Sequence, residues 1–141
     1  MARDASRWVR MAVINRLKSI ASPIPTDRIY PQQIPTSPVW PYGFVGVPIT
    51  TPDTAGCLDG SIVRFAVHGY ARTVSGGDPG ETAANKIGEA FSAALGGATL
   101  TLAAPYASDC DLAWISNTTV RDPSEASAFH VICQFEARVS S

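Results

Sequence analysis

The most constraining feature of the sequence is a long alternation of apolar and polar side chains near its end. Over residues 128–139, Phe129, Val131, Cys133, Phe135, Ala137 and Val139 alternate with His130, Ile132, Gln134, Glu136 and Arg138. Successive side chains of a strand point to opposite faces, so this period of two predicts a strand with one buried face. Residues 61–70 repeat the pattern, with Val63, Phe65 and Val67 on the apolar side. The chain therefore needs a sheet that is apolar on one face and mixed on the other.

Two more strands are predicted on either side of these. Residues 44–49 read as a first strand, with Pro48 favouring an edge or a strand end. Residues 111–117 read as a third strand, joined to the last by a polar loop over residues 118–127, and residues 98–102 as a short extended piece. Residues 23–43 are rich in proline, which is excluded from helix interiors and central strands, so we expect this segment to lie over the surface.

Two helices are predicted. The first begins at Asp4 as N-cap and runs to about Ser22, where Pro23 stops it. The second begins with Asp78 as N-cap, Pro79 at the first helical position and Glu81 completing a capping box, and it ends at Leu95 before two glycines. The buried face predicted for the first helix consists of Ala5, Val9, Ala12, Val13, Leu17 and Ile20.

The element order is helix, strand, strand, helix, strand, strand. This order predicts an α+β fold, in which a mainly antiparallel four-stranded sheet carries both helices on its apolar face. The length of 141 residues favours a single domain over residues 1–141. No stretch is apolar enough to span a membrane, and we expect neither a signal peptide nor a membrane partner.

The charge is unevenly distributed along the chain. Residues 1–28 hold six basic and two acidic residues, a net charge of +4, whereas residues 29–141 hold five basic and ten acidic residues, a net charge of -5. The charged fraction of 16% is below the ~25% usual for globular chains, which favours a surface partly covered by partners. The second face of the first helix mixes apolar and basic residues and is the candidate subunit or partner interface: Arg7, Arg10, Met11, Ile14 and Lys18.

The sequence shows no catalytic centre, cofactor site or metal site. His68 and His130 share the mixed face of the sheet, but no third ligand sits at metal spacing. Asp109 and Asp111 lack a partner base and read as solvated residues at a strand entrance. Cys57, Cys110 and Cys133 form no CxxC pair, which favours a reducing compartment, and the last two read as core residues. The chain is therefore not expected to be an enzyme.

Several motifs in a fixed order resemble one known family. They are residues 28–35 (RIYPQQIP), residues 40–48 (WPYGFVGVP), the alanine-rich helix over residues 83–95, Leu100 and Leu102, Trp114, and the Arg121-Asp122 loop. Over essentially the whole chain, this order resembles the tail-completion (tail terminator) proteins of long-tailed bacteriophages and gene transfer agents, which are similar in fold to the tail terminator of phage lambda.

The resemblance implies a structural virion protein of the tail and neck, assembled in the host cytoplasm. It implies a ring, with six subunits, that caps the tail tube, stops its growth and joins the tail to the head. Its partners would be other copies of itself, the tail tube protein and a head-completion (stopper) protein, with DNA passing through the ring and no sequence-specific nucleic-acid contact. The family carries no catalytic residues.

Three other functions stay open at this stage. Another neck or tail structural protein is the nearest alternative. A soluble α+β module that binds or converts a small molecule would need a polar pocket that the sequence does not indicate. A nucleic-acid binder would use the basic first helix, although the rest of the chain is acidic.

Overall fold

The described part of the chain forms two helices and one seven-stranded sheet. In the computed structural model, the described residues are 4–20, 24, 28–30, 34–53, 60–73, 76–103, 109–123, 125 and 127–140, so Cys57 lies outside them. The elements, in order, are α1 (Ser6–Lys18), β1 (Ile29–Tyr30), β2 (Tyr42–Val45), β3 (Ile49–Asp53), β4 (Gly60–Arg72), α2 (Gly80–Leu95), β5 (Thr99–Thr101), β6 (Asp109–Arg121) and β7 (Ala128–Ser140).

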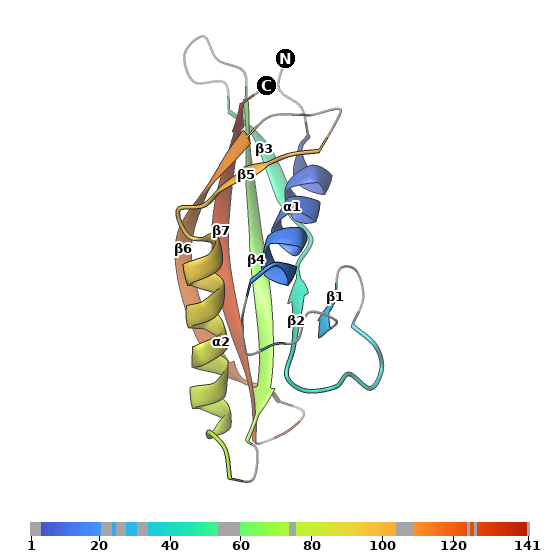
Figure 1. Cartoon of the computed structure of the whole chain (residues 1–141), viewed down its shortest axis with the longest axis vertical. Coiled ribbons are helices and arrows are strands. Elements are labelled where there is room, and N and C mark those ends of the chain that lie inside the picture. Colours follow the sequence, from blue (N-terminus) through green and yellow to red (C-terminus); the bar gives the residue numbers. More distant parts are fainter. Residues whose placement is uncertain are drawn as a thin grey trace.

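The fold is α+β, but the predicted four-stranded, mainly antiparallel sheet is wrong. The strand order is β1-β2-β4-β7-β6-β5, with β3 also paired to β4, and β1 runs parallel to β2. The sheet is therefore mixed, and it curls around the helices as a half-barrel (Figure 1).

The proline-rich segment accounts for much of this difference. Pro48 divides the predicted first strand into β2 and β3, and each pairs with a different half of the long strand β4. Ile29 in β1 is 2% exposed and belongs to the hydrophobic core, so this segment contributes to the core as well as the surface. Short strands at a sheet edge tolerate prolines that a central strand excludes.

Three long strands form the centre of the sheet. β4, β6 and β7 each contain 13 residues, and β7 pairs with β4 on one side and β6 on the other. β6 continues to Arg121, so the loop predicted from Thr118 begins four residues too early. Thr118 pairs with Ile132 and Arg121 with Phe129, and β-branched residues such as threonine suit a paired strand.

Both helix starts differ from the prediction. α1 begins at Ser6 with Ala5 as N-cap, while the Asp4 carboxylate accepts a hydrogen bond of 2.9 Å from the Ser6 N–H. α2 has Pro79 as N-cap, and Asp78 forms no cap. Asp78 instead pairs with Lys86 at 2.6 Å, and the Gly80 N–H donates to Thr73 Oγ1 at 2.9 Å. Neither described helix has the length and apolar character that a membrane span requires.

Both helices lie on the concave face of the sheet (Figure 1) and share its hydrophobic core. α2 approaches the sheet at two glycines. A Cβ added at Gly69 of β4 would lie 2.4 Å from Ile87 Cγ2, and one added at Gly88 of α2 would lie 2.8 Å from Val131 Cγ2. Only residues without side chains allow this separation, so even a methyl group at either position would push α2 off the sheet.

Phe91 is the largest side chain at this contact and is 0% exposed. Phe91→Ala is expected to lower the free energy of unfolding by about 3–5 kcal/mol, because it removes buried apolar surface and leaves a cavity. Urea unfolding followed by circular dichroism measures the change. Glu89→Ala, at an exposed position of the same helix, is the control and should change stability by less than about 0.5 kcal/mol. Equal effects of the two substitutions would contradict this packing.

Candidate subunit and partner interfaces

The predicted interface residues on α1 occupy three different environments. Arg7, Met11 and Lys18 are exposed, Met11 to 47%. Arg10 is half-buried: its Nη2 donates to the Val45 carbonyl at 2.7 Å, and its Nε is buried without a hydrogen-bond partner among the described residues. Ile14 is 8% exposed and belongs to the core. Arg10 thus ties α1 to β2, and Ile14 is not available on the surface.

The burial of Ile14 follows from the number of neighbours around α1. This helix contacts α2, β1, β2 and β5, and Arg16 Nε donates to the Ala94 carbonyl of α2 at 3.1 Å. The buried arc is therefore wider than one face packed on a sheet. Four exposed residues of α1 lie opposite Val9, Val13 and Leu17 and point away from the sheet. They are here called the α1 stripe: Arg7, Met11, Asn15 and Lys18.

The helix-free face of the sheet carries an exposed apolar feature, which the sequence did not reveal. Val47, Ile49 and Ile115 are 84%, 68% and 50% exposed. They surround a shallow hollow of about 330 Å³, together with Arg64, Ala66 and Gln134. This set is called the outer hollow.

A β-bulge between Trp114 and Ser116 helps to form the outer hollow. Trp114 pairs with Phe135 and Ser116 with Gln134, so Ile115 is the extra residue in β6. Bulges re-aim side chains and increase local twist. Because a bulge depends on the pairing of two strands, no local signal in the sequence pointed to Ile115.

Aromatic rings form a ladder on the same outer face, beside the hollow. His68 Nδ1 lies 2.6 Å from His130 Nε2, the rings of His130 and Tyr70 stack at 4.2 Å, and those of Tyr70 and Tyr42 stack at 4.6 Å. The two histidines meet across β4 and β7, as their strand parity predicted. The stacked rings cover one another's faces, so this ladder joins three strands rather than offering open faces to nucleotide bases.

Burial shifts the pKa of the groups in the ladder. It lowers the pKa of His130 to about 4, with the neighbouring His68 as a further cause, and it lowers the pKa of His68. Burial also raises the pKa of Tyr42 to about 12, helped by the nearby Tyr70 and Asp122. At neutral pH both imidazoles are uncharged, and one donates its proton to the other. No group of three metal-ligating side chains occurs among the described residues.

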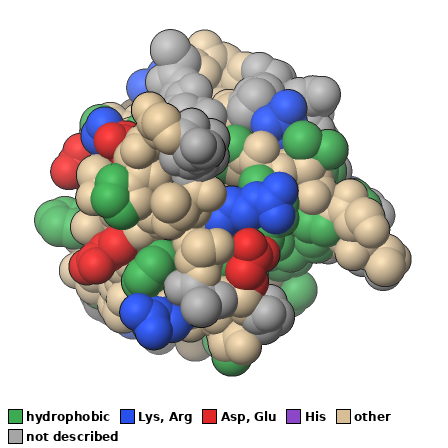
Figure 2. Space-filling view, turned by 90° about the horizontal axis from the view of Figure 1, so that it is seen from below, with side chains coloured by type: hydrophobic (Ala, Val, Ile, Leu, Met, Phe, Trp, Pro, Cys, Tyr) green, Lys and Arg blue, Asp and Glu red, His purple; other side chains and the backbone are tan. Residues whose placement is uncertain are grey.

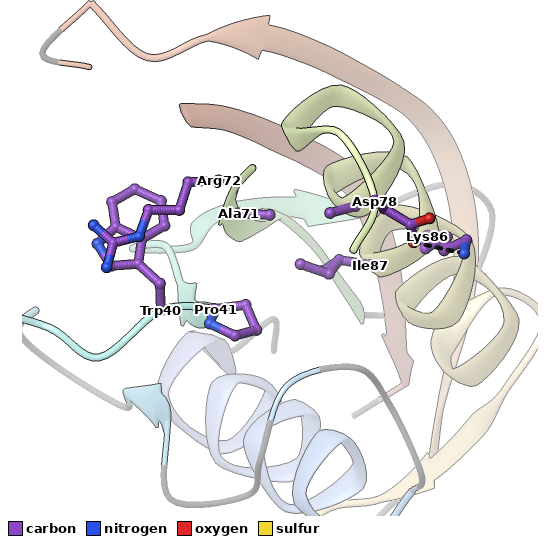
Figure 3. Close-up of a pocket in the computed structure, with 8 residues that line it drawn as sticks. Trp40, Pro41, Ala71, Arg72, Asp78, Lys86 and Ile87 are labelled. Carbon is purple, nitrogen blue, oxygen red and sulfur yellow. Dashed lines mark hydrogen bonds and ion pairs between the residues drawn. The ribbon is translucent and has the colours of Figure 1, made fainter. Parts of the chain in front are cut away.

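A small pocket lies between the segment at Trp40 and the first turns of α2 (Figure 3). Its volume is about 230 Å³, below the roughly 300–1,000 Å³ of ordinary small-molecule sites. Its charged groups already have partners: Asp78 pairs with Lys86, and the Arg72 guanidinium lies 5.3 Å from the centre of the Trp40 ring. The pocket therefore offers mainly apolar walls, which does not favour the small-molecule alternative.

The other candidate residues lie where the sequence placed them. Cys110 and Cys133 are buried in the core, and burial raises their thiol pKa values to about 11 and 12. Asp109 and Asp111 are exposed at the start of β6 and accept hydrogen bonds from Thr101 and Thr99. Seen from below, the acidic and basic side chains of the described residues are interspersed rather than gathered into one basic patch (Figure 2).

Two comparisons with known proteins give matches. The family model described as tail completion protein gp17 matches residues 11–140. The fold is similar to that of a chain in the virion of the native gene transfer agent (GTA) particle, with a TM-score of 0.79 and 20% sequence identity over 98% of both chains. No curated protein matches the chain by sequence.

The lowered pKa of His130 makes the stability of the fold depend on pH. Between its unfolded value of 6.5 and its folded value of about 4, the unfolded chain binds more protons than the folded chain. The free energy of unfolding should therefore fall as the pH decreases from 6.5 towards 4. His130→Gln, which can still hydrogen-bond but does not titrate, should reduce this slope. Urea unfolding of both proteins at several pH values measures the difference, and identical slopes would contradict the prediction.

Proposed function

The chain belongs to the tail completion protein gp17 family and is a structural component of a virion tail, and we propose that it caps the tail tube as a closed ring. In this proposal the ring stops polymerisation of the tube and joins the tail to the head. The ring has six subunits, its partners are the tail tube protein and a head-completion (stopper) protein, and DNA passes through its centre.

The observation that carries this proposal is the family match, which extends over residues 11–140 and thus over nearly the whole chain. The fold likeness supports it, because the similar chain is part of a gene transfer agent virion and is covered along 98% of its length. The outer hollow, with three exposed apolar side chains, also favours assembly, since exposed apolar patches commonly mark interaction sites.

The α1 stripe is the proposed contact surface, with Arg7, Met11 and Lys18 as its contact residues. Arg10 contributes by fixing α1 on β2 through the Val45 carbonyl. Exposed charges are screened beyond about 8 Å at physiological salt, so Arg7 and Lys18 orient the approaching partner more than they hold it. Met11 supplies the apolar contact.

Ring formation is tested with the purified protein. Size-exclusion chromatography with light scattering at micromolar concentration should give a mass of six chains, and negative-stain images should show rings with a central hole. If the protein alone is monomeric, the same measurements are made with purified tail tubes, whose ends the protein should then cap. A monomer that also leaves tube ends free and tube growth unchanged would refute the proposal.

A basic helix is also the feature on which the nucleic-acid alternative depends. Arg7→Gln with Lys18→Gln should slow assembly and reduce its salt dependence, because the two charges steer association. Met11→Ser should instead weaken the assembled state and leave the salt dependence of the assembly rate unchanged. A gel shift with duplex DNA at low salt separates the alternatives. Tight DNA binding that the double variant abolishes, with unchanged assembly, would favour nucleic-acid binding.

A further inference from the structure

The edge of the sheet formed by β3 is poorly suited to pairing with another chain. Gly46 N–H donates to the Ala66 carbonyl, so the even-numbered residues of β4 direct their backbone groups towards β2 and β3. Ile49 and Thr51 pair with Arg64 and Ile62, which leaves the backbone groups of Thr50 and Pro52 pointing outward. Pro52 has no N–H, and neither does Pro48 two residues before Thr50.

Thr50 is therefore the one backbone N–H donor on the outer edge of β3. Of the other described edge strands, β1 and β5 contain only two and three residues. β6 is paired with β5 only from Asp109 to Asp111, so its outer edge has no strand partner further along among the described residues. Prolines and very short strands are the usual protection against edge-to-edge association. At the edge formed by β3, contacts with another copy therefore come from side chains rather than from an added strand.

The molecule has two broad faces. Figure 1 looks onto one of them, and the other lies behind it. The helices occupy one face and the outer surface of the sheet forms the other. A stable interface buries about 800 Å² on each partner, and a broad face provides this area more readily than a narrow edge. The α1 stripe lies on the helical face, and the outer hollow lies on the sheet face. The two features therefore point in opposite directions.

The two features also match in chemistry. Met11 is a flexible, exposed apolar side chain, and the outer hollow is bordered by Val47, Ile49 and Ile115. Methionine fills irregular apolar gaps well. Ala66 contributes only a methyl group to the hollow, so a long side chain from outside finds room there.

Each of the two features has a charged residue at a similar distance: Lys18 from Met11 on α1, and Asp111 from Ile115 on β6. Lys18 lies about 10 Å along α1 from Met11, at 1.5 Å per helical residue. Asp111 lies about 13 Å along β6 from Ile115, at roughly 3.3 Å per strand residue, and shares the outer face with the hollow. Asp111 is exposed and accepts a hydrogen bond from Thr99, but it forms no ion pair in the described part of the chain. If Met11 enters the hollow of a second copy with α1 aligned along β6, Lys18 falls within side-chain reach of this carboxylate.

We propose that the outer hollow of one copy receives Met11 of the α1 stripe of the next copy. This proposal rests on the proposed ring and specifies its subunit contact. The contact joins two different patches on opposite faces, so it is heterologous and repeats from copy to copy until the rotation closes. The sheet of each subunit then packs on the helices of its neighbour.

Crosslinking tests the contact directly. Met11→Cys and Ile115→Cys are combined in a chain that also carries Cys57→Ser, because Cys110 and Cys133 are buried. A short dithiol crosslinker should yield a ladder of covalent multimers, since the two positions face opposite sides of one copy and meet only between copies. The matched control is Met11→Cys with Val120→Cys, because Val120 is also exposed on the outer face of β6 but lies about 17 Å further along the strand. The control should give no ladder.

A substitution at the hollow provides a second measurement. Ile115→Asp should weaken self-association at least about tenfold, because it places an unpaired charge at an apolar contact. Val120→Asp is the control and should leave association unchanged. Circular dichroism and thermal unfolding check that both variants fold.

The possible failures are distinguishable. Rings in electron micrographs without a ladder, or equal ladders from both cysteine pairs, would overturn the proposed contact and leave the ring intact. If Ile115→Asp spares self-association but abolishes binding to the tail tube, the hollow belongs to the tube protein and the proposal is wrong. Absence of any multimer, both alone and on tail tubes, would overturn the contact and the proposed function together.

Discussion

The pairing of β4 with β7 is the interaction on which the rest of the structure depends. Thirteen residues of each strand pair without interruption, from Gly60 with Ser140 to Arg72 with Ala128. Because the register is continuous, alternate side chains stay on one face over the whole length of the sheet. One face thus receives both helices, while the other carries the aromatic ladder and the outer hollow. A shift of one residue would exchange the two faces and expose the core.

The sequence predicted this central pair well, because alternation over a long strand is a local and repeated signal. Val63, Phe65, Val131 and Phe135 are all buried, as their spacing indicated. The family resemblance read from the ordered motifs is confirmed by the family model. The α+β class is correct, whereas the number of strands and the direction of their pairing were predicted wrongly.

The errors share a physical cause: each concerns a choice that depends on distant residues. The cap predicted at Asp78 is absent because Lys86 binds its carboxylate and Thr73 satisfies the Gly80 N–H. Ile14 is buried because strands and a second helix surround α1. β1 and the start of β2 form within the proline-rich segment, and β2 and β3 form on either side of Pro48 because β4 is long enough to pair with both. The outer hollow needs a bulge that exists only once β6 lies beside β7.

The two outward-facing prolines beside β3 have a consequence for the time before assembly. In the proposed assembly, each subunit stays in solution until its partners are available. An open strand with exposed valine and isoleucine is the kind of segment that stacks into cross-β fibrils. Pro48 and Pro52 interrupt the hydrogen-bond ladder that such a fibril requires, while Val47 and Ile49 stay exposed. This edge thus keeps exposed apolar side chains for contacts without acting as a template for aggregation, which in the proposed assembly would protect the subunit before it binds its partners.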